Sequence, residues 1–278
     1  MATSVKGAGP PPTAAPSKAR DAVDGALTGA GEWAQFFGAS IRGMAGAPRY
    51  ASETVRQTAI LMSGTWGMLL VMNMFQGFTL QNAAYFLLSP IGAGDYSGLI
   101  TGYALPRQTA PLMFGYVIAA KACCGMAAEI GAMRIQQEID ALEQTGVDPM
   151  RFVVGPRLIA LLLFVPLGAA ICIIGQTAGA WIDATFVLQA ISGESLLSVA
   201  WSMQSIAMEL YAALTMALIA LFCGVTACFY GMRARGGPAN VGTAVARSLK
   251  VNLVLVHVLA GAMSVMYYGA NINLPLGG

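Results

Sequence analysis

Charged side chains are scarce in this sequence, and four long stretches contain none. Only 10% of the 278 residues are Asp, Glu, Lys or Arg, whereas a soluble globular domain carries about 25%. The charge-free stretches lie between Arg56 and Asp95, between Arg157 and Asp183, between Glu209 and Arg233, and after Lys250. Each can supply the ~20 apolar residues with which a helix crosses about 30 Å of hydrocarbon. The chain is therefore expected to be an integral membrane protein.

Signals for chemistry at a catalytic or cofactor site are also missing. The five cysteines lie in apolar segments without metal or disulfide spacing, and His257 is the only histidine. None of the four lysines stands in the G-x-x-x-x-G-K-[ST] loop that cradles phosphates. We expect no metal, no cofactor and no enzymatic activity in this chain, so any ATP hydrolysis must occur on another polypeptide.

The apolar runs predict an all-α membrane fold. They are continuous rather than alternating, which excludes a transmembrane barrel, and helices satisfy their own backbone groups in lipid. Residues 27–45 carry aromatic and apolar side chains near helical spacing but are too few and too polar to span, which is typical of an interfacial helix. Residues 1–25, rich in Pro, Ala and Gly, are expected to be a disordered cytoplasmic tail. Five spans are predicted at about 58–78, 108–128, 158–182, 203–230 and 251–268.

Basic residues in the short connections predict the orientation of the spans. Thirteen of the 15 Lys and Arg residues fall in the N-terminal arm, after the second span or after the fourth; the exceptions are Arg107 and the intramembrane Lys121. Positive charge gathers on the cytoplasmic side. We therefore expect a multi-pass plasma-membrane (inner-membrane) protein with its N-terminus in the cytoplasm and its C-terminus outside.

Residues 129–145, between the second and third spans, predict a short amphipathic helix on the cytoplasmic side. On a continuous helix Ala132, Ile135, Ile139 and Leu142 share one apolar stripe, and Gly146 with the later Pro149 supplies a stop signal. The helix could simply rest on lipid headgroups. However, surface helices usually carry basic residues, and this one has four acids before residue 145 and only Arg134 as a base. Contact with a protein accounts better for the acidic edge.

The same segment resembles the coupling-helix signature of the MlaE/YrbE permeases. The matching positions are Glu129, Gly131, Met133, Ile139, Asp140, Ala141, Leu142, Gly146 and Pro149. Further matches are Arg157 after Pro156, Tyr230-Gly231, Gly236-Gly237-Pro238 and Val241-Gly242. The sequence departs from the family pattern at Gln137-Glu138, where Glu-Gln is usual, at Lys121, where Arg is common, and near Thr215, where a Lys is often found. The long Pro/Ala-rich tail and the overall style resemble the actinobacterial YrbE proteins of Mce systems more than the proteobacterial MlaE proteins.

The resemblance implies that residues 26–278 are the permease domain of an ABC-type lipid transporter. It implies a dimeric ATPase partner that binds ATP and Mg²⁺, a second YrbE-type permease in a heterodimer, and MCE proteins on the outer side. Fatty acids and sterols are the implied cargo. The residues implied to couple the permease to the ATPase are Glu129, Gly131, Met133, Glu138, Asp140, Leu142, Glu143 and Gly146.

Five further residues are candidates for the transport path. Lys121 and Glu209 are ionisable groups within spans, which are functional candidates by default, although they could pair with each other or reach a polar region by snorkelling. Met68, Met72 and Phe75 offer flexible apolar surface suited to a lipid, but ordinary lipid-facing packing explains them equally well. His257 has no carboxylate near it in sequence and is expected to be a packing residue with its polar atoms satisfied.

Two other functions remain open at this point. A secondary transporter driven by an ion gradient requires paired intramembrane acids or repeated halves with broken helices, and the sequence offers one such acid, Glu209, and no evident repeat. A non-transporting scaffold for outer-side proteins has no need of the acidic helix. Such a scaffold would not copurify with a nucleotide-binding protein.

Overall fold

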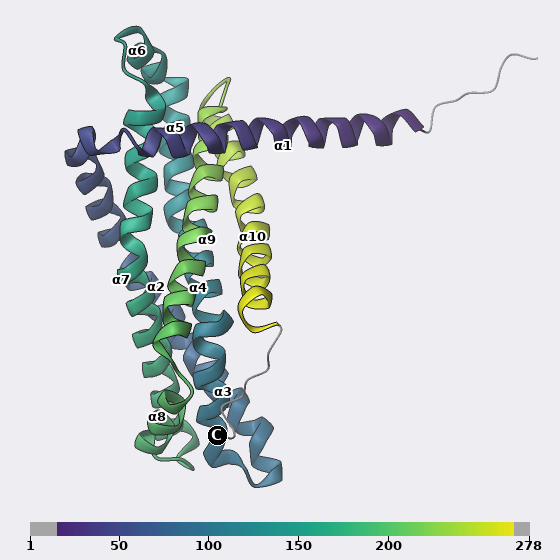
Figure 1. Cartoon of the computed structure of the whole chain (residues 1–278), viewed down its shortest axis with the longest axis vertical. Helices are drawn as coiled ribbons and strands as arrows, with labels where there is room; N and C mark the ends of the chain where they lie inside the picture. Colours follow the sequence, from purple (N-terminus) through teal and green to yellow (C-terminus); the bar gives the residue numbers. More distant parts are fainter. Residues whose placement is uncertain (1–15, 270–278) are drawn as a thin grey trace, which may run out of the picture.

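The computed structural model describes residues 16–269, which form an all-α bundle without a strand in that range (Figure 1). Five helical stretches are long and apolar enough to cross a membrane: Ala51–Ile91, Gly94–Ile135, Met150–Leu188, Ile206–Met232 and Pro238–Tyr267. They confirm the five predicted spans. Most are longer than predicted because helix continues past the charge-free core. Of the expected disordered tail, residues 1–15 lie outside the described range, and the first helix begins at Pro16.

The elements follow one another with short connections. The helices are α1 (Pro16–Met44), α2 (Ala51–Leu88), α3 (Ser97–Ala104), α4 (Ala110–Val117), α5 (Cys124–Ile135), α6 (Glu138–Gln144), α7 (Gly155–Ile182), α8 (Gly193–Ser202), α9 (Ile206–Met232) and α10 (Pro238–Tyr268). Wider π-helical turns join α3 to α4 at Leu105–Thr109 and α4 to α5 at Ile118–Cys123, so that α3, α4 and α5 form the second span. Similar turns at Met150–Val154 and Asp183–Leu188 flank α7.

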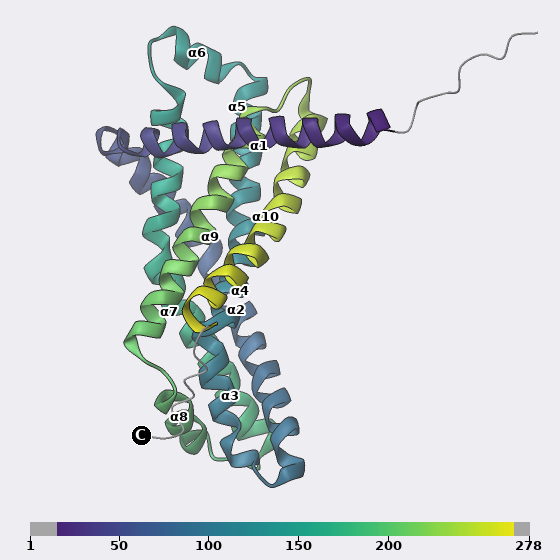
Figure 2. The same ribbon diagram turned by 45° about the vertical axis from the view of Figure 1, so that its right-hand side comes forward.

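Helix α1 lies across one end of the bundle, nearly perpendicular to the spans (Figures 1 and 2). Its aromatic side chains hold it there: the ring of Trp33 stacks on that of Phe222, and Phe36 meets Phe229 edge-on. The indole Nε1 of Trp33 also donates a hydrogen bond to Thr226. Residues 27–45 were predicted to form a helix at the membrane interface, and the helix found there is longer, since α1 starts at Pro16 rather than near residue 27.

Helices α2 and α7 approach each other closely because glycines line their contact. A Cβ atom on Gly77 would collide with the carbonyl oxygen of Gln176, and one on Gly179 with that of Met74. Small residues allow such close approach of helices in membranes. Across the same contact the Gln176 amide donates to Asn73 at 2.9 Å. Backbone proximity and buried hydrogen bonds therefore join the first and third spans.

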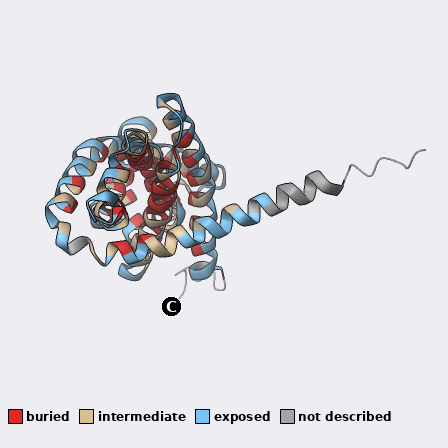
Figure 3. Ribbon diagram, turned by 90° about the horizontal axis from the view of Figure 1, so that it is seen from above, coloured by how far each residue is buried: buried red, intermediate tan, exposed pale blue. Residues whose placement is uncertain are grey.

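The second and fourth spans form the centre of the bundle, while the first and fifth lie at its periphery. Residues are buried over 61% and 67% of the apolar windows of the second and fourth spans, but over only 17% and 22% of those of the first and fifth. Viewed along the bundle, the buried residues gather at its centre (Figure 3). Helices α2 and α10 thus present apolar side chains outward, as membrane-facing helices do.

Candidate functional site

Residues 129–145 belong to two helices, the end of α5 and the whole of α6, rather than to the single helix predicted for them. Helix α5 ends at Ile135, and α6 starts at Glu138 after Gln137, whose φ is 60°. Figure 2 shows α6 lying across the tip of the bundle beyond α5. A continuous helix would carry Ile139 outward along the axis, whereas the bend buries Ile139 completely against the core. Burial of this apolar side chain favours the bend.

A defined C-terminal cap ends α6, as the predicted stop signal required. The amide of Val147 donates to the carbonyl of Leu142, and that of Gly146 to the carbonyl of Glu143, both at 3.0 Å. This pair of bonds is the Schellman arrangement. Gly146 has φ of 79°, a left-handed conformation that glycine adopts without a steric penalty. An ion pair between Arg134 of α5 and Asp140 of α6 bridges the bend at the other end.

The prediction that the acidic residues share one edge of a single helix is wrong, because the helix is broken between α5 and α6. The carboxylates of Glu138 and Glu143 are exposed on α6 and have no ion-pair partner among the described residues, while Asp140 is partly buried against Arg134. Glu129 lies on α5 rather than on α6. Gly131 is buried where a Cβ would meet Val241 at 3.2 Å, and Met133 packs against the core. The predicted coupling residues therefore divide into a packed base and a projecting acidic tip.

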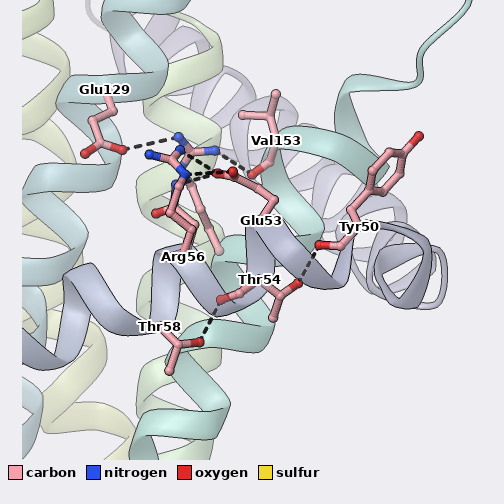
Figure 4. A network of polar contacts seen from close by, with 9 residues as sticks. Tyr50, Glu53, Thr54, Arg56, Thr58, Glu129 and Val153 are labelled. Carbon is pink, nitrogen blue, oxygen red and sulfur yellow. Dashed lines mark hydrogen bonds and ion pairs between the residues drawn. The ribbon is translucent and has the colours of Figure 1, made fainter.

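Glu129 and Arg157 connect the base of this segment to the third span. The Arg157 Nη2 group donates to Glu129 Oε2 at 3.2 Å, and Nη1 donates to the carbonyl of Val153 at 2.9 Å. The side chain of Arg157 is 7% exposed and that of Glu129 51% exposed. On α2, Glu53 accepts hydrogen bonds from Arg56 and from Gln57. Figure 4 shows Glu53, Glu129 and the Val153 carbonyl gathered at this point.

A pocket of about 230 Å³ opens beside this ion pair, between α2, the second span and α7. Lys121, Glu129 and Arg157 all line it. The Lys121 stem runs over Gly64, whose Cβ position lies 3.7 Å from Lys121 Cε. Within residues 16–269 Lys121 has no ion-pair partner. A cation in a span is costly unless water or an anion reaches it, and this pocket gives Lys121 such access.

The other candidate path residues lie elsewhere. Glu209 is in the first turn of α9, where its Oε1 is buried without a hydrogen-bond partner in the described chain, and no ion pair joins it to Lys121. The pairing considered for these two residues is therefore wrong. Met68, Met72 and Phe75 are exposed on the outward face of α2, by 44%, 44% and 62%. They form part of an apolar surface that no residue in the described range 16–269 covers.

His257 is hydrogen-bonded, as expected, but is not packed inside. Its Nε2 lies 2.7 Å from the hydroxyl of Tyr116, and its Nδ1 lies 2.9 Å from the carbonyl of Leu253. The ring is exposed on α10. The expectation that its polar atoms are satisfied is thus confirmed, and the ring packs against that of Tyr116 rather than in the core.

Two features of the site were not predicted from sequence. Arg157 was recognised only as a motif match, although an arginine at the start of a long apolar run is itself a sign of a buried ion pair. The second feature is the polar inner side of α2, where Gln57, Thr65, Asn73 and Gln81 are buried at intervals of eight residues. Polar residues that recur along an otherwise apolar, charge-free run were a usable signal.

A bundle of five long apolar helical stretches with a short helix projecting between the second and third is the architecture of a multi-pass membrane protein. The family model for Permease MlaE matches residues 54–266. The chain therefore belongs to the MlaE permease family. It is the non-catalytic membrane component of an ABC transporter, which implies an ATPase partner.

Individual relatives agree with this membership. The chain is 28% identical over 204 residues to a probable ABC transporter permease protein of Synechocystis sp., covering 72% of this chain and 75% of that protein. A probable ABC transporter permease protein of Rickettsia conorii is 23% identical over 81% of this chain and 87% of its own length. The chloroplastic protein TRIGALACTOSYLDIACYLGLYCEROL 1 of Arabidopsis thaliana is 25% identical over 75% of this chain and 59% of its own length.

Proposed function

We propose that this chain is the permease subunit of an Mce-class lipid transporter, in which ATPase movements reach the membrane through α6. A second YrbE-type permease would complete the membrane core, and MCE proteins would bind the outer end. The transported molecules would be hydrophobic lipids such as fatty acids or sterols. ATP and Mg²⁺ would be bound by the ATPase dimer.

The observation that carries this proposal is the construction of α6. It projects beyond the bundle on a stalk, is capped at Gly146, and is held to α5 by the ion pair between Arg134 and Asp140. Glu138 and Glu143 remain exposed at its tip. A projecting, fixed helix with unpaired carboxylates is suited to docking into a basic groove of a partner. Because α5 continues into the second span, displacement of α6 would act on the membrane helices directly.

The distribution of charge supports a cytoplasmic position for α6. Arg42 and Arg49 near the α1–α2 junction, Arg134 and Arg151 around α6, and Arg235 at the start of the α9–α10 connection all belong to the end of the bundle crossed by α1. Positively charged connections face the cytoplasm in membrane proteins. The proposed location is therefore the plasma (inner) membrane, with α1 along its cytoplasmic surface.

A lipid cargo is supported by the outward face of α2. This face exposes Met68, Met72 and Phe75, a flexible apolar surface that adapts to irregular acyl or ring structures. The pocket at Lys121 lies along the same helix. The Arabidopsis thaliana relative TRIGALACTOSYLDIACYLGLYCEROL 1 is named after a glycolipid, which is consistent with a lipid as the transported class.

The test is charge reversal at the tip of α6 in the reconstituted transporter. Glu138→Lys combined with Glu143→Lys should abolish lipid-stimulated ATPase activity and ATPase copurification, because both changes oppose a basic groove without disturbing the cap. Membrane insertion should be unchanged, since both side chains are exposed.

Glu194→Lys is the matched control. Glu194 is an exposed acid in the first turn of α8, another short helix, at the opposite end of the bundle. This variant should keep normal ATPase coupling. Normal coupling in the α6 double variant would contradict the proposal, and a chain that never copurifies with an ATPase would favour the scaffold alternative.

A further inference from the structure

An arginine-lined pocket opens where α9 turns into α10, away from the Lys121 pocket. It has a volume of about 370 Å³, and Arg233, Arg235 and Arg247 contribute to its wall together with Tyr230, Asn240 and Thr243. Arg233 forms an ion pair with Glu32 of α1 at 2.6 Å, and its guanidinium carbon lies 4.2 Å from the centre of the Phe229 ring. Within the described chain, Arg235 and Arg247 have no ion-pair partner. Two guanidinium groups are thus left uncompensated.

A second, mostly apolar pocket of about 510 Å³ adjoins the first beneath α1. Trp33 and Ala30 of α1 face Val251 and Leu255 of α10 across it, and Gly25 and Gly29 complete its wall. The two glycines stand one helical turn apart, and no atom lies within 4 Å of the Cβ position of either. The space under α1 therefore exists partly because these positions lack side chains.

The two pockets form one amphipathic site. They share Phe229, Tyr230 and Arg233 as lining residues, so the arginine-lined part continues into the apolar part. Figures 1 and 2 show α1 passing over the ends of α9 and α10, at the level where an interfacial helix meets headgroups. Arginine binds phosphate through paired N–H groups better than any other side chain does. Basic pockets between membrane helices on the cytoplasmic side are typical sites for acidic headgroups.

We propose that this site binds an anionic phospholipid of the surrounding leaflet. Its phosphate occupies the arginine-lined part near Arg235 and Arg247, and one acyl chain lies under α1 against Trp33, Val251 and Leu255. Such a lipid fills the space under α1 and fastens this helix to the bundle. The inference is independent of cargo and of ATPase coupling, because none of these residues belongs to α5, α6 or the outward face of α2.

Native mass spectrometry of the purified full chain, titrated with phosphatidylglycerol or phosphatidylcholine of equal chain length, tests this proposal. The wild-type protein should retain phosphatidylglycerol preferentially. Arg235→Gln combined with Arg247→Gln should weaken its retention by about tenfold or more, because charge-assisted hydrogen bonds to phosphate are lost. Arg42→Gln combined with Arg49→Gln removes the same charge from the same end outside the pockets and should leave retention unchanged.

Gly29→Leu tests the acyl part separately. No atom lies within 4 Å of the Cβ position of Gly29, so the backbone can carry a side chain here, and the leucine occupies part of the apolar pocket that Gly29 lines. This variant should lose long-chain phosphatidylglycerol but still bind a dihexanoyl analogue.

Equal loss in the Arg42/Arg49 control, or full retention in the Arg235/Arg247 variant, would overturn the proposal. Inorganic phosphate that displaces the lipid completely, with no effect of Gly29→Leu, would instead identify a free-phosphate site. Displacement of the lipid by the ATPase subunit in equal amount would identify a protein-docking surface. Either outcome would also contradict the assignment to phospholipid.

Discussion

Arg157 of the third span donates a hydrogen bond to Glu129 of the second span, directly below the segment that carries α6. The guanidinium of Arg157 is buried, and the carboxylate of Glu129 is half exposed. The pair holds α5 to α7, and Glu129 lines the pocket that contains Lys121. The ion pair therefore joins α5, which leads to α6, to α7 of the bundle core. It also lines the same pocket as Lys121, the candidate path residue.

Removal of Glu129 should destabilise the protein more than removal of both partners. Glu129→Ala leaves the Arg157 guanidinium buried without its carboxylate, at a cost of about 1–3 kcal/mol, reduced by the exposure of Glu129. Adding Arg157→Met removes the unpaired charge and should recover part of the loss. The measurement is the unfolding midpoint of the detergent-solubilised protein for both single variants and the double. Strictly additive losses would show that the two side chains are not coupled.

Glycines at the α2–α7 contact should not tolerate a methyl group. Gly77→Ala and Gly179→Ala each place a Cβ against a backbone carbonyl of the facing helix, and overpacking of this kind costs about 1–3 kcal/mol. Gly67→Ala on the same α2 helix meets no atom within 4 Å and should be neutral or slightly stabilising. Thermal unfolding of the three variants in one detergent checks this difference. If Gly67→Ala is as harmful as Gly77→Ala, the close contact is not the cause.

Substitution of Gly146 should loosen α6 without unfolding the bundle. Alanine at φ of 79° costs about 1 kcal/mol, whereas asparagine accepts this conformation more readily. Hydrogen exchange of the amides of residues 145–147 should accelerate in Gly146→Ala and much less in Gly146→Asn. Gly242→Ala, at an open helical position without positive φ, is the control. Unchanged exchange in Gly146→Ala would mean that the cap does not hold α6.

The charge of Lys121 should matter for transport if the pocket receives an anionic group. Lys121→Met removes the cation that has no ion-pair partner in the described chain, while Lys121→Arg keeps it and restores the residue common in the family pattern. Lipid-stimulated ATPase activity should fall in the first variant and persist in the second. Equal activity of both would indicate that Lys121 only extends its charge toward a polar region.

The spans were predictable because hydrocarbon imposes a simple requirement: a long run without charge. The absence of charge could not predict where the short helices α3 and α8 begin and end, because they lie outside the charge-free runs. The stop at Gly146 was predictable because glycine favours the left-handed conformation found there. The bend before α6 was not, since its left-handed residue is Gln137, a type that gives no such signal.

Contacts between distant segments were the least predictable part of the site. Nothing local in the sequence joins Glu129 to Arg157 or places Gly77 against Gln176; these depend on how the spans pack. The bend also corrects the interpretation of the acidic edge, because helical periodicity assigns a shared face only while the helix is continuous. Glu129 and Glu143 consequently have different surroundings although a single helix was expected to hold both.

Cross-linking from the tip of α6 shows whether this helix contacts the ATPase. A photoreactive residue replaces Glu143 in one variant and Glu194 in another, and each transporter is irradiated in membranes with its ATPase present. If α6 docks into the ATPase, an adduct with the ATPase forms from position 143 and none forms from position 194. An adduct from position 194 alone, or none from position 143 in an assembled complex, would contradict this docking.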